Sequence, residues 1–322
     1  MQESKINMKI GVFAPSSPAI GDRTEDTYAY LCGKGFEVYE HPQVRKVTEH
    51  TAGSVEDRVA AIHELYQDPT VDMLMSFWGG QNSNELLPHL NYSLIKANPK
   101  PLIGYSDTTA LLLAITKQTG VTTYMGPAAI TFTKPEPIDY SYENFEKLVI
   151  KKEEVIFKDA DNYADDHYYL NDDPTQREIH PNPGRRVLIE GTAMGEIIAA
   201  NLQTLLVLSG SRFPPDLKGK ILFLEESEDT NVGVIHRFLT QLTQITDIND
   251  LKGICFGRFC QQSGFSNSYP VEKLLEIVFR DATIPIIYDL NFGHSDPILT
   301  IPNGGYAEID TARNLIKISA SK

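Results

Sequence analysis

The 322-residue sequence predicts an α/β protein with a Rossmann-like, doubly wound parallel sheet in its N-terminal domain and a smaller, β-rich α/β C-terminal domain. Short apolar runs alternate with amphipathic runs of helical period over residues 9–119, and this alternation requires crossover connections between parallel strands. From residue 186 onward, short β-like runs outnumber helical ones. We therefore expect an N-terminal domain at residues 1–158, a linker or lid loop at residues 159–186, and a C-terminal domain at residues 187–322.

The predicted elements of the first domain alternate between strand and helix as far as residue 119. Apolar runs predict strands at residues 9–14, 36–40, 71–77 and 101–104. Helices are expected at residues 25–34, 54–66, 82–90, 107–119 and 140–152. Ser54, with Asp57 three residues later, resembles a capping box for the second helix. Because ligands of such sheets bind at the carboxyl ends of the strands, we expect the functional site at the turns that follow them.

The remaining segments are a polar loop and the C-terminal domain. Residues 159–186 are rich in Asp, Asn, Pro and Tyr and have no clear period, which indicates a long loop. Its Tyr163, Tyr168 and Tyr169 are candidates for stacking on a planar substrate group; the alternative is that they pack on the domain surface. Strands are then expected at residues 186–190, 193–199, 220–225, 253–259, 284–289, 298–301 and 315–319. Helices are expected at residues 201–209, 232–243 and 271–279.

Composition argues against several classes of partner. The formal net charge is -14, which repels the phosphates of nucleic-acid polymers and anionic membrane surfaces. Three cysteines without Cys-x-x-Cys spacing give neither a disulfide framework nor a zinc site. The N-terminus lacks the pattern of a signal peptide, and no apolar run approaches about 18 residues. We expect a cytoplasmic protein that binds neither membranes nor nucleic acid.

No cofactor motif is recognisable. The sequence has no His-Glu-x-x-His metal motif and no phosphate loop of the Gly-x-x-x-x-Gly-Lys type. The first predicted strand is followed by Ala14-Pro-Ser-Ser-Pro18, which lacks a Gly-x-Gly-x-x-Gly pattern and in which two prolines remove N–H donors. We expect neither a metal nor an organic cofactor.

Ser106 is the first candidate for a catalytic residue, because a predicted strand meets a predicted helix at this position. It lies in Gly104-Tyr-Ser-Asp107. A serine at such a turn projects its hydroxyl from the carboxyl edge of the sheet, and the N–H groups of the helix start form an anion site beside it. This is the geometry of a nucleophile, although Asp107 replaces the second glycine of the lipase-type motif. The alternative is that Ser106 only caps the helix.

A serine nucleophile needs a base that takes its proton and an acid that orients the base. His294 is the best-placed histidine, because it follows a strand-like run through a glycine and precedes a proline-bounded strand. Glu225 and Glu226 stand at the carboxyl end of an apolar strand, and only one of them can face the histidine, since strand side chains alternate. Asp296 is a competing acid that we expect to shape its own turn.

Gly79 and Gly80 follow the strand predicted at residues 71–77. Two glycines leave backbone N–H groups accessible, so this turn and the N–H of Asp107 are candidates for an oxyanion hole. A tight turn between a strand and a helix would use the same glycines without any catalytic role.

At these residues the chain resembles the LD-carboxypeptidase family of serine peptidases. The resemblance also includes Ala14-Pro-Ser-Ser-Pro18, Asn82-Ser-Asn-Glu-Leu-Leu-Pro88, Gly126-Pro127 and Asn201-Leu-Gln-Thr-Leu205. It implies a triad of Ser106, Glu225 and His294, an oxyanion hole from Gly79, Gly80 and Asp107, a cleft between the two domains, and a homodimer. Glu226 departs from relatives that carry Asp there, which leaves open which carboxylate acts.

Asn82-Ser-Asn-Glu85 makes the chain most similar to the microcin C immunity branch of that family. That branch implies hydrolysis of an amide bond near a carboxyl terminus in a peptidyl or aminoacyl nucleotide. Independently of the resemblance, the polar loop offers Tyr168 and Tyr169 as candidate substrate-binding residues that would stack on the base of such a nucleotide. Two alternatives remain: a muropeptide L,D-carboxypeptidase of peptidoglycan recycling, whose relatives often carry Arg where this chain has Trp78, and a non-catalytic homologue that binds a small ligand.

Overall fold

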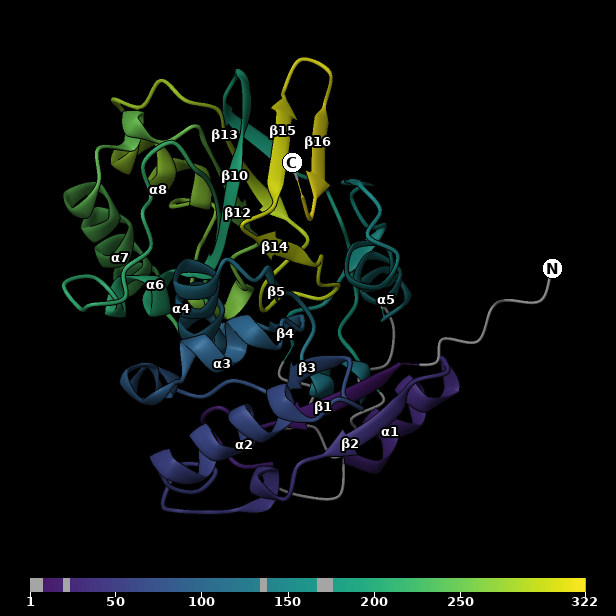
Figure 1. Ribbon diagram of the computed structural model, residues 1–322. Coiled ribbons are helices and arrows are strands. Elements are labelled where there is room, and N and C mark those ends of the chain that lie inside the picture. Colours follow the sequence, from purple (N-terminus) through teal and green to yellow (C-terminus); the bar gives the residue numbers. More distant parts are fainter. Residues whose placement is uncertain (1–7, 20–23, 134–137, 167–175, 322) are drawn as a thin grey trace.

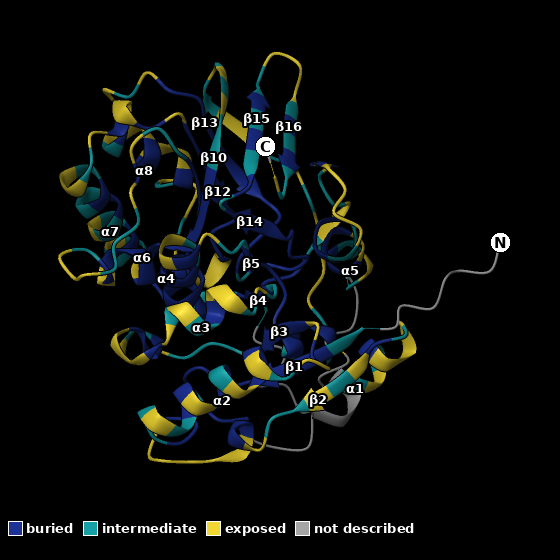
Figure 2. Ribbon diagram, viewed as in Figure 1, coloured by how far each residue is buried: buried dark blue, intermediate teal, exposed yellow. Residues whose placement is uncertain are grey.

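A computed structural model describes residues 8–19, 24–133, 138–166 and 176–321. Its strands form two large sheets and one short hairpin, with helices packed around them (Figure 1). Buried residues run along both sheets, whereas the exposed residues lie mostly on the outer faces of helices and in loops (Figure 2). The predicted α/β class, with a parallel sheet in the N-terminal part and a β-rich C-terminal part, is confirmed.

The first sheet has the strand order β14-β5-β4-β3-β1-β2. Its members are β1 (Lys9–Phe13), β2 (Glu37–Glu40), β3 (Met73–Ser76), β4 (Leu102–Gly104), β5 (Thr123–Met125) and β14 (Ile301–Asn303). Strands β1 to β5 are parallel, and β14 is antiparallel to β5. The carboxyl ends of β1, β3 and β4 therefore meet at one edge, and the turns that follow them carry Ser16, Gly79 and Ser106.

The first sheet differs from the prediction in two respects. The strand predicted at residues 298–301 is found at Ile301–Asn303, and it completes the first sheet because Ile301 pairs with Met125. Strand β5 has no counterpart in the prediction, since its sequence, Thr-Tyr-Met, is not a continuous apolar run.

The second sheet has the strand order β6-β16-β15-β10-β11-β12-β13-β9. Its members are β6 (Val155–Ile156), β9 (Arg186–Ile189), β10 (Thr192–Asn201), β11 (Ile221–Glu225), β12 (Gly253–Gly257), β13 (Ile286–Leu290), β15 (Tyr306–Asp310) and β16 (Leu315–Ser319). Strands β10 to β13 are parallel; β11, β12 and β13 are buried throughout, and β10 is buried over its second half. Strands β6, β9, β15 and β16 pair in antiparallel fashion at the two sides. Strand β15 was not predicted.

The helices cover the sheets and, in one case, join them. The α-helices are α1 (Thr24–Gly33), α2 (Val55–Gln67), α3 (Tyr92–Ala97), α4 (Thr109–Thr119), α5 (Ile138–Phe145), α6 (Leu202–Val207), α7 (Val232–Ile245) and α8 (Val271–Val278). Helix α4 is buried on almost every side, which is expected of a helix with the sequence Ala-Leu-Leu-Leu-Ala-Ile at its centre. It contacts β4 of the first sheet and β10 of the second, so it is the joint between them.

Short helices account for other differences from the prediction. Helix α3 was not predicted, and the helix expected at residues 82–90 is the 3-10 helix η2 (Ser83–His89), since Pro88 lies inside it. The helix expected at residues 107–119 begins as the 3-10 turn η3 (Ser106–Thr108) before α4. The remaining short helices are η1 (Pro42–Arg45), η4 (Ala129–Thr133), η5 (a π-helix, Glu146–Ile150), η7 (Ile248–Asp250) and η8 (Gln261–Ser263).

The predicted loop at residues 159–186 is described at both of its ends. Strands β7 (Asn162–Tyr163) and β8 (His180–Pro181) pair to form a hairpin at its base. Ala164 also forms an isolated bridge with Asp296, so this loop is attached to the segment that follows β13. The division into domains at residues 158 and 187 stays a prediction.

Candidate active site

Ser106 lies on a strained turn between β4 and α4. Its φ is 60°, in the left-handed region that a side chain rarely adopts. Gly104 makes room for the turn, because a Cβ atom there would lie 2.1 Å from Ser76 Oγ. The N-cap residue of α4 is Thr108, so helix capping does not account for Ser106. The Ser106 hydroxyl instead lies 3.1 Å from Nε2 of His294, 188 positions away in the chain.

His294 connects Ser106 to Glu225. Its Nδ1 lies 2.6 Å from Oε2 of Glu225, the last residue of β11. The Glu225 side chain is fully buried, and the His294 side chain is 9% exposed. Gly257 and Gly293 allow this close packing, since a Cβ atom at Gly293 would lie 2.5 Å from Glu225 Oε2 and one at Gly257 would lie 2.9 Å from Glu225 Cβ. The serine, histidine and glutamate predicted as a triad are thus brought into one hydrogen-bonded row.

The two competing acids point elsewhere. Glu226 accepts hydrogen bonds from the backbone N–H groups of Gln203 and Ser227, at 3.1 and 2.9 Å, and from the side chains of Asn201 and Thr230. It therefore fixes the start of α6, and burial raises the pKa of its carboxyl. Asp296 forms an ion pair with Arg177 at 3.0 Å.

Carboxylates surround the His294 ring on both sides. Glu228 Oε2 lies 3.9 Å from Nε2, the same nitrogen that faces Ser106. Burial is the largest influence on the His294 pKa and lowers it. The charges of Glu225 and Glu228, the hydrogen bond to Glu225 and the charge of Glu226 together outweigh burial and raise the pKa to about 9. The ring of Tyr105 packs edge-on at 5.0 Å between centroids and limits rotation of the imidazole.

The Gly79-Gly80 turn lies directly beside the Ser106 hydroxyl. A Cβ atom at Gly79 would lie 3.0 Å from Ser106 Oγ and 3.2 Å from the backbone N of Asp107, so only glycine fits. Gly80 has a φ of 140°, which also requires glycine. Among the described residues, none accepts a hydrogen bond from the N–H groups of Gly79, Gly80 or Asp107. Of these three residues, Gly79 and Asp107 lie directly next to Ser106.

Some residues of this site were not predicted from the sequence. Ser83 donates its backbone N–H to Asp107 Oδ2 at 2.7 Å and its hydroxyl to the Asp107 carbonyl at 2.5 Å, which attaches the glycine turn to the serine turn. Burial raises the pKa of the Asp107 carboxyl, while the hydrogen bond from Ser83 opposes that change. Glu228 and Tyr105 were also overlooked, since neither stands out from its neighbours in the sequence.

The loop tyrosines were predicted to stack on substrate or to pack on the protein. Tyr163 packs on the protein: its ring lies beneath the Arg258 guanidinium, 4.3 Å from the ring centroid, and its hydroxyl accepts a hydrogen bond from Gln261. Tyr168 and Tyr169 lie outside the described residues.

Metal-binding groups and membrane spans were also searched for in the described residues. No group of three or more His, Cys, Asp or Glu side chains there is arranged to hold a metal ion. Across the same residues, none of the helices has the length and apolar character needed to span a membrane. Cys32, Cys255 and Cys260 are free thiols.

Comparison with known proteins identifies related sequences over most of the chain. Residues 10–126 match the model of the LD-carboxypeptidase N-terminal domain, and residues 194–309 match that of the LD-carboxypeptidase C-terminal domain. The Microcin C7 self-immunity protein MccF of Escherichia coli is 32% identical over 96% of this chain and 92% of its own. The Murein tetrapeptide carboxypeptidase of Pseudomonas aeruginosa is 25% identical over 96% of this chain and 95% of its own.

Solved structures with the same fold cover nearly the whole chain. The crystal structure of an MccF-like protein from Bacillus anthracis has a TM-score of 0.92 and 31% identity, and the match covers 99% of this chain and 98% of that one. The structure of MccF in complex with aspartyl sulfamoyl adenosine has a TM-score of 0.89 and 30% identity, covering 98% and 97% of the two chains.

Proposed function

The chain belongs to the LD-carboxypeptidase family of serine peptidases, and we propose that it hydrolyses an amide bond near a carboxyl terminus with Ser106 as nucleophile, His294 as general base and Glu225 as the orienting acid. The observation that carries this proposal is the position of His294, whose two ring nitrogens lie 3.1 Å from Ser106 Oγ and 2.6 Å from Glu225 Oε2. Glu225 is preferred to Glu226 because Glu226 hydrogen-bonds to α6 and its neighbours instead.

The proposed reaction begins when neutral His294 accepts the Ser106 proton on Nε2. Ser106 Oγ then attacks the substrate carbonyl, and the tetrahedral oxyanion accepts hydrogen bonds from the N–H groups of Gly79, Gly80 and Asp107. His294 returns the proton to the leaving nitrogen as the C–N bond breaks, which leaves an acyl-serine. Water then attacks the acyl carbon while His294 takes its proton. His294 returns this proton to Ser106 Oγ as the bond between the acyl carbon and Oγ breaks, which releases the carboxylic acid and restores the free serine. A base of this kind contributes roughly 10²–10⁴-fold, and one oxyanion donor on the order of 10²-fold or more.

For the substrate, we propose a peptidyl or aminoacyl nucleotide conjugate of the microcin C type. Two observations support this choice. Relatives named MccF share about a third of the residues over nearly the full chain, and one is described in complex with aspartyl sulfamoyl adenosine. In addition, two residues of the motif that suggested this branch lie next to the Gly79-Gly80 turn: the backbone N–H of Asn82 donates to Ser16 Oγ, and the Asn82 side chain donates to Glu85. The alternative substrate is an L,D-linked murein peptide, because a murein tetrapeptide carboxypeptidase is also related.

One experiment tests both the proposed serine mechanism and the proposed substrate, and it compares two substrates and two serine variants. Wild-type protein is incubated with aspartyl sulfamoyl adenosine and with an L,D-tetrapeptide, and products are measured by mass spectrometry. Ser106→Ala should abolish turnover and preserve the fold, whereas the control Ser211→Ala, in a loop outside the site, should leave turnover unchanged. Full activity of folded Ser106→Ala would contradict the serine mechanism, and cleavage of the tetrapeptide alone would transfer the substrate assignment to murein.

We also propose that the protein is a cytoplasmic homodimer, as the resemblance and the sparse cysteines suggest. Light scattering on the purified protein measures the molar mass, and a value near that of one chain would contradict the dimer.

A further inference from the structure

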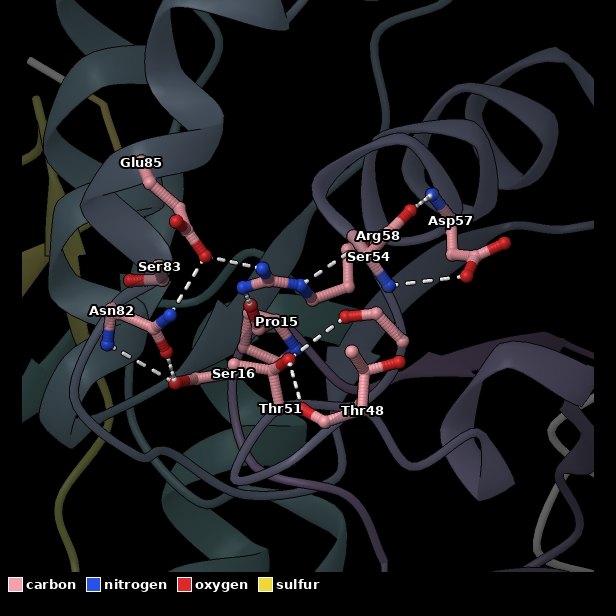
Figure 3. A network of polar contacts seen from close by, with 12 residues as sticks. Pro15, Ser16, Thr48, Thr51, Ser54, Asp57, Arg58, Asn82, Ser83 and Glu85 are labelled. Carbon is pink, nitrogen blue, oxygen red and sulfur yellow. Dashed lines mark hydrogen bonds and ion pairs between the residues drawn. The ribbon is translucent and has the colours of Figure 1, made fainter.

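A network of polar contacts connects Ser16, Asn82, Glu85 and Arg58, of which Ser16 and Arg58 are buried (Figure 3). We infer that Ser16, with the Arg58–Glu85 ion pair behind it, positions the Gly79-Gly80 turn so that its N–H groups face the Ser106 hydroxyl. The inference rests on the proposed function, because it takes these N–H groups to be oxyanion donors. Ser16, Arg58 and Glu85 are positioning residues that act through the turn.

Ser16 uses its whole hydrogen-bonding capacity on the segment after the two glycines. Its hydroxyl accepts from the backbone N–H groups of Gln81 and Asn82, at 3.0 and 3.1 Å, and donates to Asn82 Oδ1 at 2.7 Å. A hydroxyl has one donor and two acceptor positions, so none is left over. Ser16 is buried, and a Cβ atom at Gly80 would lie 2.4 Å from its Oγ, so the hydroxyl packs directly against the turn.

The direction of these bonds explains why the glycine donors remain available. Ser16 occupies the N–H groups of Gln81 and Asn82, and Ser17 donates its backbone N–H to the Gly79 carbonyl at 3.2 Å. The peptide groups on either side of Gly80 are therefore fixed, while no described residue accepts from the N–H groups of Gly79 and Gly80. This leaves two fixed donors beside Ser106, as preorganised electrostatic stabilisation requires.

Arg58 connects the turn after β1 to the turn after β3. It projects from α2, is only 2% exposed, and donates to the Pro15 carbonyl at 3.1 Å while it pairs with Glu85 (Figure 3). Glu85 Oε1 also accepts from Asn82 Nδ2 at 2.7 Å, so the ion pair holds the residue that Ser16 binds. Burying a guanidinium is costly, and an apolar side chain would anchor α2 at a lower desolvation cost. The pair fixes the register of the two turns, which an apolar contact would not do.

The expected effect of loosening this support is a slower chemical step with little change in binding. A misplacement of about 1 Å in a catalytic group costs on the order of 10²-fold in rate. We therefore expect Ser16→Ala to lower kcat by roughly 10–100-fold and to change KM by less than about threefold, because the lost stabilisation belongs to the oxyanion of the transition state.

The test uses matched variants and two readouts. The first is kcat and KM on aspartyl sulfamoyl adenosine or the L,D-tetrapeptide, whichever the wild-type protein cleaves. The second is the rate at which a fluorophosphonate modifies Ser106, measured by intact mass. Glu85→Ala should lower both kcat and the rate of fluorophosphonate modification. Glu85→Gln keeps an oxygen that accepts hydrogen bonds from Asn82 and Arg58, so its kcat and modification rate should be close to those of the wild-type protein. Ser54→Ala removes a hydroxyl from the cap of α2, so it should lower the melting temperature and leave both rates unchanged.

The outcomes separate this inference from the proposed function. If Ser106→Ala is inactive and Ser16→Ala keeps kcat within about twofold of wild type, the positioning role is refuted and the serine mechanism stands. An equal loss in Ser54→Ala would also refute it, since the effect would then be one of general stability. If the folded wild-type protein neither cleaves a substrate nor reacts with the fluorophosphonate, the proposed function fails, and the positioning role fails with it.

Discussion

Replacement of Glu225 by Gln should change the pH dependence of the enzyme in a direction that the structure determines. In the wild-type protein, surrounding carboxylates outweigh burial and raise the His294 pKa to about 9, from an ordinary value of 6.5. At pH 7 only about 1% of the imidazole is then neutral and able to accept the Ser106 proton. We expect kcat/KM of the wild-type enzyme to increase about tenfold per pH unit and to level off near pH 9.

Glu225→Gln removes the nearest charge but preserves the shape of the side chain. Burial, which is the largest influence on the His294 pKa and lowers it, is then opposed by less negative charge, so the midpoint of the pH profile should move to lower pH. The plateau of kcat should fall by on the order of 10⁴-fold, because an amide no longer enforces the tautomer with a proton on Nδ1. The assay is kcat/KM from pH 6 to pH 10 on the preferred substrate.

The free energy of unfolding should decrease as the pH rises, whereas kcat/KM increases. Because the folded pKa of His294 lies above the unfolded value, the ion pair with Glu225 stabilises the fold fully below pH 6.5, and this contribution is lost as the pH rises through about 9. The difference between the two pKa values corresponds to roughly 3 kcal/mol. Urea unfolding at pH 6 and pH 9.5 measures it, and Glu225→Gln should remove most of the difference.

Glu226→Gln is the matched control. Glu226 has no hydrogen bond to His294, so its substitution should cost about 1–3 kcal/mol of stability through the lost acceptor at Gln203 N while most of kcat is retained. A wild-type profile centred near pH 6.5 that Glu225→Gln does not move would refute the reasoning about charge. A larger loss of kcat in Glu226→Gln than in Glu225→Gln would transfer the orienting role to Glu226.

Three further outcomes are expected. Gly293→Ala should destabilise the protein by more than the roughly 1–2 kcal/mol that a positive φ costs, and it should abolish activity, because the added Cβ would meet Glu225. Gly210→Ala is the control, since Gly210 has a similar φ but open space where its Cβ would lie, and it should lower stability without changing activity. Urea unfolding measures the stability of each variant, and kcat measures its activity. Glu228→Gln should shift the pH midpoint of kcat/KM to lower values with little loss of plateau kcat, and an unchanged midpoint would show that its charge does not reach His294. Prolonged chelation should leave activity unchanged, and activity that is lost and then restored by a divalent ion would contradict a mechanism based on side chains and backbone donors.

The sequence was sufficient to predict the elements that carry the site, and it was weakest at short ones. Strands β1, β3, β4 and β11 are apolar runs with a clear beginning and end, so the residues at their carboxyl ends were predicted correctly. Strand β5 and helix α3 were missed because each is short and mixes polar with apolar residues. Strand β14 joins the first sheet through pairing with a strand about 175 positions earlier, and no local pattern reports such a contact.

The choice between Glu225 and Glu226 shows what a sequence cannot supply. Alternation along a strand says that the two side chains point in opposite directions, but it does not say which direction leads to His294. The choice depends on the residues that pack around each carboxylate. Gly257 and Gly293 leave room for the Glu225 side chain next to His294, whereas the start of α6 provides a backbone N–H, that of Gln203, to Glu226. Arg58 was missed for a related reason, since a charged residue in a predicted helix is usually assigned to the surface.

The two sheets divide the proposed chemistry between them, and α4 connects the two parts. The first sheet supplies the nucleophile and the backbone donors, all from turns at one edge, whereas the second supplies the acid at the end of β11 and the histidine after β13. The 3.1 Å contact between Ser106 and His294 therefore crosses from one sheet to the other. Helix α4 begins just after Ser106 and is buried against both sheets, so the packing of its apolar residues sets the position of the nucleophile relative to its base.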